Sequence, residues 1–232
     1  MPHRDKYLFI FAHPDDETSS SGGTIAKLVK QNHSVHVCSA TKGEEGTLGS
    51  QGVSIAKSDL PKIREQELRE AMDLYGAHSP IFLDYRDQEL EAVGQDKLQE
   101  TIFDVISSVR PDFVITFGPS GISKHPDHIA IHQATTGAYH VFQSCCPRCK
   151  LLYVAIPDTY NTFNLDLADI ERNPNVIIDI SNEFNVKLTA LRNYKSQEDA
   201  QVLADMFEQN ILAVEAFTEW NRPQEAPVRD TF

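Results

Sequence analysis

Short apolar runs and longer stretches with helical spacing alternate along the chain. The runs have the length of buried strands, and the longer stretches repeat apolar residues every three to four positions, as one face of a helix does. The predicted strands cover residues 7–12, 34–40, 80–84, 112–117, 151–156 and 175–180. The predicted helices cover residues 23–31, 61–76, 95–109, 126–143, 182–194 and 198–208. Repeated strand–helix units indicate an α/β fold, a Rossmann-like three-layer sandwich with a mostly parallel sheet.

Two segments fall outside this alternation. The stretch from Thr41 to Leu60 is polar, rich in glycine and too long for an ordinary connection, so it is expected to be functional or mobile. The end of the chain, residues 223–232, is polar and is expected to be a poorly packed tail. Because no composition shift marks a boundary, residues 1–222 are expected to form one domain.

Composition narrows the classes of function. Of the 232 residues 41% are apolar, which is ample for a core, and the net charge of −13 argues against nucleic-acid or anionic-membrane surfaces. No stretch approaches the ~20 apolar residues of a membrane helix, and the start of the chain lacks the features of a secretory signal. A soluble cytoplasmic protein is therefore expected.

The cysteines give no clear chemistry. Cys38 lies in a predicted strand and is expected to be a small core residue. Cys146 and Cys149 have CxxC spacing beside Cys145, but no second pair and no histidine pair accompany them. No role is assigned to these three residues.

Ligand-type side chains follow two of the predicted strands. The strand at 7–12 is followed directly by His13, Pro14, Asp15, Asp16 and Glu17. The strand at 112–117 is followed, after a loop, by His125, Pro126, Asp127 and His128. Because the carboxyl ends of parallel strands meet at one edge of a sheet, the two turns can converge on one metal ion.

Each turn also has a plainer interpretation. Asp15 and Asp16 can simply cap a helix, and histidines in a first helical turn are often surface residues. Catalytic zinc commonly has three protein ligands and one open position, so the five candidate side chains are more than the metal requires. The surplus is what a hydrolase requires, namely a base and an acid beside the metal. The candidates are His13, Asp15, Asp16, His125 and His128.

These motifs resemble the LmbE-like (PIG-L) family of zinc-dependent de-N-acetylases. The two turns match the family's AHPDDE and HPDH motifs, and weaker matches follow in the family's order over about residues 7–197. The weaker matches are the T-[RK]-G-E-x-G loop at 41–46, the R-x-x-E-L helix at 64–68, the aspartate-bearing loop at 85–90, and the late helix end with Lys187, Ala190 and 195–197.

The resemblance implies a metal site with a base. His13, Asp16 and His128 would bind Zn²⁺, with Fe²⁺ or another divalent metal as alternatives. Asp15 would be the general base that takes a proton from water. The implied activity is removal of an N-acyl group, most simply acetyl, from an N-acetylglucosamine-type sugar or glycoside.

The resemblance also implies roles around this centre. His125 would stabilise the oxyanion or protonate the departing amine, and Asp127 would orient His125. Arg64 would lie near the carboxylates, and Asp87 would face substrate hydroxyls. Some family members carry a tyrosine two residues before the HPDH motif, where this chain has Ser123. Oxyanion stabilisation would then rest on the metal and His125.

Two other classes of function compete. A non-hydrolytic Rossmann-like metal or nucleotide-binding protein would need a glycine-rich first turn, and the chain has His-Pro-Asp-Asp there. A catalytically dead regulatory module would lack the free base, yet Asp15 is present. The expected partner is a small-molecule amino sugar, without nucleic acid or a membrane span; homo-oligomer formation is left open.

Overall fold

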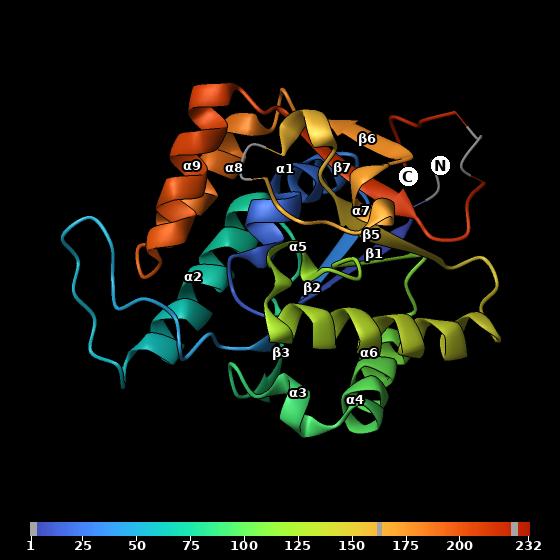
Figure 1. The fold of residues 1–232 in the computed structure, drawn as a ribbon, viewed down its shortest axis with the longest axis horizontal. Helices are drawn as coiled ribbons and strands as arrows, with labels where there is room; N and C mark the ends of the chain where they lie inside the picture. Colours follow the sequence, from blue (N-terminus) through green and yellow to red (C-terminus); the bar gives the residue numbers. More distant parts are fainter. Residues whose placement is uncertain (1–3, 162–163, 224–226) are drawn as a thin grey trace.

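The protein is built around one twisted sheet (Figure 1). A computed structural model describes residues 4–161, 164–223 and 227–232. Within these residues seven strands pair in the order β3-β2-β1-β4-β5-β7-β6. The strands are β1 (Lys6–Phe11), β2 (Ser34–Thr41), β3 (Ile81–Tyr85), β4 (Phe113–Thr116), β5 (Lys150–Ala155), β6 (Val176–Asp179) and β7 (Val214–Glu219).

The sheet is mostly parallel. β1 pairs in parallel with β2 and β4, β2 with β3, and β4 with β5. β7 runs antiparallel to both of its neighbours, β5 and β6. In the central register Phe9 pairs with Val37 and Ile115, and all three side chains are buried. Central strands that are apolar on both faces require cover on both sides, and the helices provide it.

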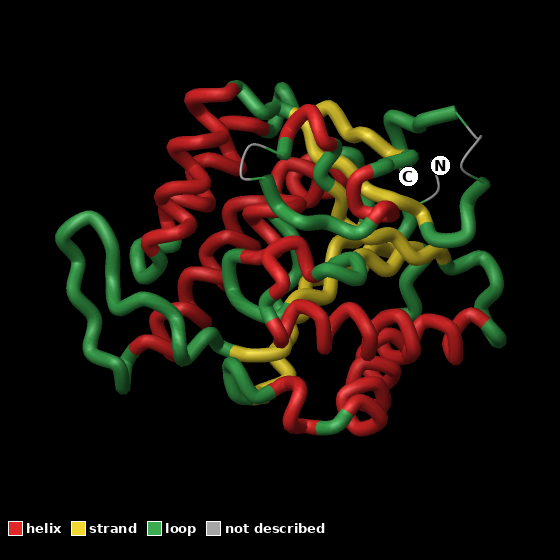
Figure 2. The backbone as a smooth tube through the Cα atoms, in the orientation of Figure 1, coloured by secondary structure: helices red, strands yellow, loops and turns green. Residues whose placement is uncertain are grey.

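Helices form the two outer layers (Figures 1 and 2). α1, α2, α8 and α9 lie on one face of the sheet, and α4 and α6 lie on the other. α4 illustrates why these helices pack against the sheet. Its residues Leu98, Ile102 and Ile106 share one apolar face at a spacing of four and are fully buried. The longer helices are α1 (Asp16–Lys30), α2 (Leu60–Tyr75), α4 (Gln95–Val109), α6 (Pro126–Gln143), α8 (Phe184–Asn193) and α9 (Glu198–Asn210). The one-turn helices are α3 (Leu90–Val93), α5 (Gly121–Lys124), α7 (Asp169–Arg172) and the 3₁₀ turn η1 (Asp158–Tyr160).

The α/β prediction is confirmed, but the short elements α3, α5, α7 and η1 were not predicted, and two longer elements also differ from it. The first helix begins at Asp16 rather than near residue 23. Its first turns are polar yet buried, so they lack the apolar periodicity that marks a helix. The strand β7 was not predicted at all. Its inner positions include the buried polar residues Glu215 and Thr218, which interrupt the apolar run expected of a central strand.

Two residues of the described part of the tail contact the rest of the fold. The backbone of Arg229 accepts a hydrogen bond from the N–H of Ile177 at 2.8 Å and donates one to the carbonyl of Asn175 at 3.0 Å. The ring of Phe232 lies 5.5 Å from that of Tyr7 and 5.2 Å from that of Phe217. Arg229 and Phe232 are half-buried, whereas the other described residues of the stretch 227–232 are exposed.

The sheet order fixes where a site can form. β1 lies between β2 and β4, so the chain leaves β1 on one side and returns on the other. In α/β sheets this switch point opens a crevice at the carboxyl ends of the strands. The loops after β1 and β4 both begin at this edge. Among the described helices none is long and apolar enough to cross a membrane.

Candidate active site

Three side chains from the two motifs meet at the switch point. His13 Nδ1 lies 3.2 Å from His128 Nε2 and 3.6 Å from an oxygen of Asp16. His128 Nε2 lies 3.4 Å from the other oxygen of Asp16. These side chains are only 9%, 12% and 10% exposed for His13, His128 and Asp16, respectively. The two turns therefore come together as the sequence suggested.

The spacing of the two imidazole nitrogens and the Asp16 carboxylate fits a small divalent cation. Zinc bound tetrahedrally at about 2.0–2.1 Å places neighbouring ligand atoms about 3.3 Å apart. The two nitrogens lie 3.2 Å apart, and each lies 3.6 or 3.4 Å from one of the two oxygens of Asp16, which is close to that value. Two imidazole nitrogens and a carboxylate are also a donor set that suits zinc and iron.

In both histidines, one ring nitrogen is hydrogen-bonded on the side away from the cluster. The other nitrogen, which faces the cluster, is then available as a ligand. His128 Nδ1 lies 3.0 Å from the carbonyl oxygen of Gly121, which can only accept, so Nδ1 carries the hydrogen. His13 Nε2 faces two carboxylates, so it too carries hydrogen. The Nε2 atom of His128 and the Nδ1 atom of His13 are thus the nitrogens left for a cation.

The two carboxylates behind His13 correct two expectations. Asp127 Oδ2 lies 3.2 Å and Asp87 Oδ1 2.9 Å from His13 Nε2. Asp127 was expected to orient His125, but its carboxylate contacts the ring of His13 instead. Asp87 was expected to face substrate hydroxyls, but it is 5% exposed and its other oxygen accepts the backbone N–H of Glu45 at 2.9 Å. Both acids act on His13, in the way that carboxylates commonly orient metal-binding histidines.

The local field favours positive charge at His13. Burial alone would lower the pKa of His13, but the hydrogen bonds to Asp127 and Asp87 outweigh it and raise the pKa to about 10. Burial lowers the pKa of His128, although the nearby Asp16 opposes this shift. The same carboxylates, Asp127, Asp87 and Asp16, also favour a cation at this site.

The general-base candidate, Asp15, stands beside this cluster. Its backbone has φ of +105°, a strained value for a residue other than glycine. Its Oδ2 atom accepts a hydrogen bond from Arg64 at 2.9 Å, and Arg64 also bonds to the carbonyl of Pro14. Burial raises the pKa of Asp15 well above its usual range, with Asp199 adding to the shift and Arg64 opposing it. A raised pKa suits a carboxylate that must accept a proton.

The loop at residues 41–46 packs closely against Arg64. Gly43 has φ of +64°, and a Cβ atom there would lie only 2.0 Å from the guanidinium of Arg64. The carbonyl of Gly43 accepts a hydrogen bond from Arg64 Nη1 at 3.1 Å. Glycine at this position therefore lets the backbone approach the arginine that holds Asp15. The expected location of Arg64 near the carboxylates is confirmed.

His125 lies at the open side of the cluster. Its ring centroid is 4.9 Å from that of His13 and 5.1 Å from that of His128. Its Nδ1 atom accepts the backbone N–H of Asp127 at 3.2 Å, so in the neutral ring Nε2 carries the hydrogen. The three histidines form a second group whose nitrogens lie within 4.8 Å of one another. The tighter spacing through Asp16 favours the group of His13, Asp16 and His128 as ligands.

Two further groups shape His128 and escaped the sequence argument. The ring of Phe117 stacks on that of His128 at 4.2 Å between centroids and 11° between planes. A Cβ atom on Gly121, whose φ is +61°, would lie 2.7 Å from the Cβ of His128. Phe117 was predicted only as the end of a strand. Its position at a carboxyl end was the signal that it borders the site.

Other residues of the weaker motifs pair with one another. Glu67 accepts hydrogen bonds from the backbone N–H and hydroxyl of Ser196, at 2.9 and 2.5 Å. The side-chain oxygen of Gln197 accepts the N–H of Thr47 at 3.2 Å. The late helix end thus anchors both α2 and the loop that follows β2, although these segments are far apart in the sequence.

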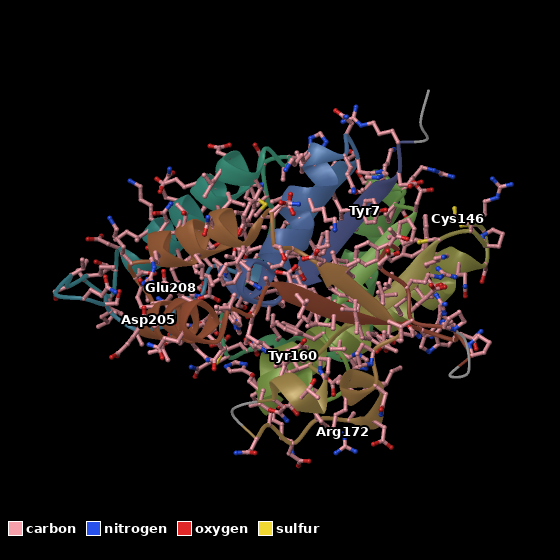
Figure 3. The ribbon with its side chains drawn as sticks, turned by 90° about the horizontal axis from the view of Figure 1, so that it is seen from above. Tyr7, Cys146, Tyr160, Arg172, Asp205 and Glu208 are labelled. Atoms are coloured by element: carbon pink, nitrogen blue, oxygen red, sulfur yellow. The ribbon has the colours of Figure 1, made fainter. Side chains whose placement is uncertain are left out.

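The cysteine-rich turn lies elsewhere. Cys146 is at the end of the molecule opposite Asp205 and Glu208 of α9 (Figure 3). All four cysteines are free thiols, and Cys38 is buried as expected. The groups that could hold a metal within the described residues draw on histidines and aspartates and on none of these cysteines.

An α/β sandwich with a histidine–aspartate cluster at its switch point belongs to the class of proteins that bind a metal at the carboxyl edge of a sheet. Comparison with known proteins narrows this class. Residues 8–139, more than half of the chain, match the family described as PIG-L, GlcNAc-PI de-N-acetylase. The chain belongs to this family.

The relatives differ in how much of them the chain covers. A probable N-acetyl-alpha-D-glucosaminyl L-malate deacetylase 2 of Bacillus cereus is 32% identical over 197 residues, covering 84% of both chains. A 1D-myo-inositol 2-acetamido-2-deoxy-alpha-D-glucopyranoside deacetylase of Rhodococcus jostii is 37% identical over 153 residues, covering 57% of this chain and 52% of the relative. The chain thus spans about half the length of the inositol-type relative.

Solved structures share the fold at low identity. The N,N'-diacetylchitobiose deacetylase from Pyrococcus horikoshii superposes with a TM-score of 0.70 at 24% identity, covering 95% of this chain and 84% of the other. GalB, a 4-carboxy-2-hydroxymuconate hydratase from Pseudomonas putida, gives 0.72 at 20% identity, covering 94% and 97%. Proteins named for different reactions thus share this fold, so the reaction must be argued from the site.

Proposed function

We propose that the protein is a metal-dependent hydrolase that removes the acetyl group from an N-acetylglucosamine-type sugar or glycoside. The observation that carries the proposal is the tight group of His13, Asp16 and His128 with Asp15 beside it. The relatives named as deacetylases of glucosamine conjugates support the same reaction. The donor set suits Zn²⁺, and Fe²⁺ is the alternative.

The side chains divide the chemistry among them. When bound, the divalent cation supplies Lewis-acid charge that activates water and polarises the amide carbonyl. The Oδ2 atom of Asp15 is occupied by Arg64, so its Oδ1 atom is left to take the proton from the attacking water. The buried guanidinium of Arg64 keeps the carboxylate in place while it gains and loses this proton.

The hydrogen bonds of His125 select between its two expected roles. Because Nδ1 accepts the N–H of Asp127, Nε2 carries the hydrogen in the neutral ring. A neutral imidazole is a poor acid for an amine but a good donor to an oxyanion. We therefore assign His125 to the carbonyl oxygen. The proton held by Asp15 passes to the amine nitrogen as the carbon–nitrogen bond breaks, giving acetate and the free amino sugar.

Acetate release with metal analysis tests the proposal. Purified protein is expected to hold about one divalent metal per chain and to release acetate from N-acetylglucosamine conjugates. Asp15→Asn should keep the metal and lose activity by about 10²–10⁴-fold. Asp59→Asn, an exposed carboxylate, is the matched control and should leave both unchanged. Failure to release acetate from any such conjugate, or full activity in Asp15→Asn, would refute the proposed reaction.

The two histidines of the second motif should behave differently. His128→Ala is expected to lose metal, because it removes one of the three close donors. His125→Ala should keep the metal and lose about 10²–10³-fold in kcat, the usual effect of removing one oxyanion donor. If His125→Ala lost the metal and His128→Ala retained it, the two assignments would have to be exchanged.

We further infer a small-molecule amino-sugar partner and action in the cytoplasm. The net charge of −13 supports neither nucleic acid nor an anionic membrane as a partner. Arg64, whose Nε atom is buried and has no partner among the described residues, remains the proposed substrate-binding residue. Assembly into a homo-oligomer remains a prediction, which the mass of the protein in solution would test.

A further inference from the structure

A cavity of about 350 Å³ opens directly beside the candidate active site. Asp15, Asp16 and His128 are among the side chains that line it. Its volume lies within the range of small-molecule pockets, about 300–1,000 Å³. Because these three side chains also belong to the reacting centre, the cavity is positioned to hold a part of the substrate that is covalently joined to the scissile amide.

The rest of the wall is largely apolar. Residues of α8, α9 and β7 contribute to it, and α8 and α9 lie side by side (Figure 1). The apolar side chains that line it include Leu191 of α8, Leu203 and Phe207 of α9, Ile156 after β5, and Leu212 and Val214 at the start of β7. The opposite side of α9 carries Asp205 and Glu208, which are exposed and pair with Arg192 (Figure 3). α9 thus separates an apolar inner side from a charged outer side.

Two of the charged groups in the wall, Lys187 and Glu215, are paired with one another. Lys187 Nζ donates to Glu215 at 2.7 Å and to the carbonyl of Ser19 at 2.9 Å. Glu215 also accepts the backbone N–H groups of Gly23 and Thr24, at 3.0 and 2.7 Å. Both side chains are at most 3% exposed. Because these two charges are already committed to each other, they offer little to a buried hydroxyl, and burying a polar group without a partner is costly. The other polar side chains of the largely apolar wall are Ser19, Ser20, Ser123, Tyr160, Asn161 and Asp199.

We propose that this cavity binds an unbranched hydrocarbon chain of the substrate, so that the natural substrate is amphiphilic. The chain can be an acyl group longer than acetyl on the amide nitrogen, or an alkyl group on the sugar's aglycone. The polar sugar amide lies beside Asp15, Asp16 and His128, and the hydrocarbon extends toward Leu203 and Phe207. This inference rests on the proposed function, because it assumes that the sugar amide is what these side chains receive.

Two substrate series separate the two sources of the chain. One series is methyl glucosaminide carrying N-acetyl, N-butyryl, N-hexanoyl or N-octanoyl groups. The other is N-acetylglucosamine carrying methyl, butyl, hexyl or octyl aglycones. In one of the series kcat/KM, measured as released amine, should rise by up to roughly fourfold per added methylene until the cavity is full. At least about a tenfold gain is expected from the two-carbon to the six-carbon acyl group, or from the methyl to the hexyl aglycone.

A pair of variants on α9 locates the effect. Leu203→Trp fills the cavity and should abolish most of the gain with chain length. Val202→Trp is the matched control, since Val202 is the neighbouring residue and is 52% exposed. It should keep both the wild-type activity and the wild-type dependence on chain length.

The outcomes distinguish this inference from the proposed function. Hydrolysis of the acetyl substrates with a flat profile in both series would overturn the hydrocarbon site and leave the deacetylase proposal intact. If no member were hydrolysed, binding of hexyl and methyl glucoside by calorimetry would still decide the inference. Tighter binding of the hexyl compound that is lost in Leu203→Trp would support the site, and equal binding of the two would refute it.

Discussion

Asp127 offers the sharpest test of how the cluster is held, because its carboxylate receives three N–H donors in a fully buried place. Oδ2 accepts from His13 Nε2 at 3.2 Å and from the backbone N–H of Gln88 at 2.7 Å, and Oδ1 accepts from that of Leu90 at 3.2 Å. In Asp127→Asn one oxygen becomes an NH₂ group, which cannot accept. At least one buried donor then loses its partner in either orientation of the amide.

The expected loss of stability follows from the number of buried donors that lose their partner. One unpaired buried donor costs about 1–3 kcal/mol, so the free energy of unfolding should fall by about that amount. Loss of a carboxylate behind a metal-binding histidine typically lowers metal affinity by about 10–100-fold. Asp87, 2.9 Å from the same nitrogen, remains in place, so the affinity should fall without disappearing.

Competition with a chromophoric zinc chelator measures the affinity, and urea unfolding measures the stability. Asp104→Asn, which changes an exposed carboxylate on α4, serves as the control and should match wild type in both assays. The reasoning is refuted if Asp127→Asn binds zinc as tightly as wild type while its turnover falls. That pattern would indicate that Asp127 orients His125, which is the role first expected from the sequence.

Three further substitutions test the surroundings of the site and the stability of the fold. Gly43→Ala places a Cβ against the guanidinium of Arg64, so turnover of acetylated substrate should fall at least about tenfold, because that arginine holds the base. Lys187→Met leaves Glu215 buried without its counter-charge and should lower the free energy of unfolding by about 3–5 kcal/mol in urea. Burial lowers the pKa of His36 to about 4, below its ordinary value of 6.5. Its unfolded form therefore takes up the proton first, so stability should fall as the pH drops from 6.5 to 4, and less so in His36→Gln.

Matched variants isolate each cause. Gly52→Ala also has a positive φ, +85°, but nothing lies within 4 Å of the added Cβ, so it should show backbone strain without loss of turnover. Lys30→Met removes a 69% exposed lysine from an ion pair and should cost less than about 1 kcal/mol. Three results would contradict the stated causes. They are an equal loss of turnover in Gly43→Ala and Gly52→Ala, and an equal loss of unfolding free energy in Lys187→Met and Lys30→Met. The third is the same dependence of stability on pH in wild type and His36→Gln.

Local patterns predicted the parts of the fold whose burial is apolar. The run at 7–12 and the helical spacing of Leu98, Ile102 and Ile106 correspond to observed elements. The start of α1 and the whole of β7 were missed, because their buried positions carry polar side chains such as Glu17 and Glu215. These groups are satisfied by partners far along the chain. Glu17, for example, accepts a hydrogen bond from the hydroxyl of Tyr194 at 2.6 Å.

The sequence by itself determined which residue types reach the site, because motif spacing and strand ends are local properties of the chain. His13, Asp15, Asp16 and His128 were all identified in this way. Only the tertiary structure decided what each contacts, since a hydrogen bond depends on which segments lie side by side. It turned Asp127 and Asp87 toward His13. It also placed an apolar cavity, lined by residues from eight separate elements and their loops, against Asp15 and Asp16.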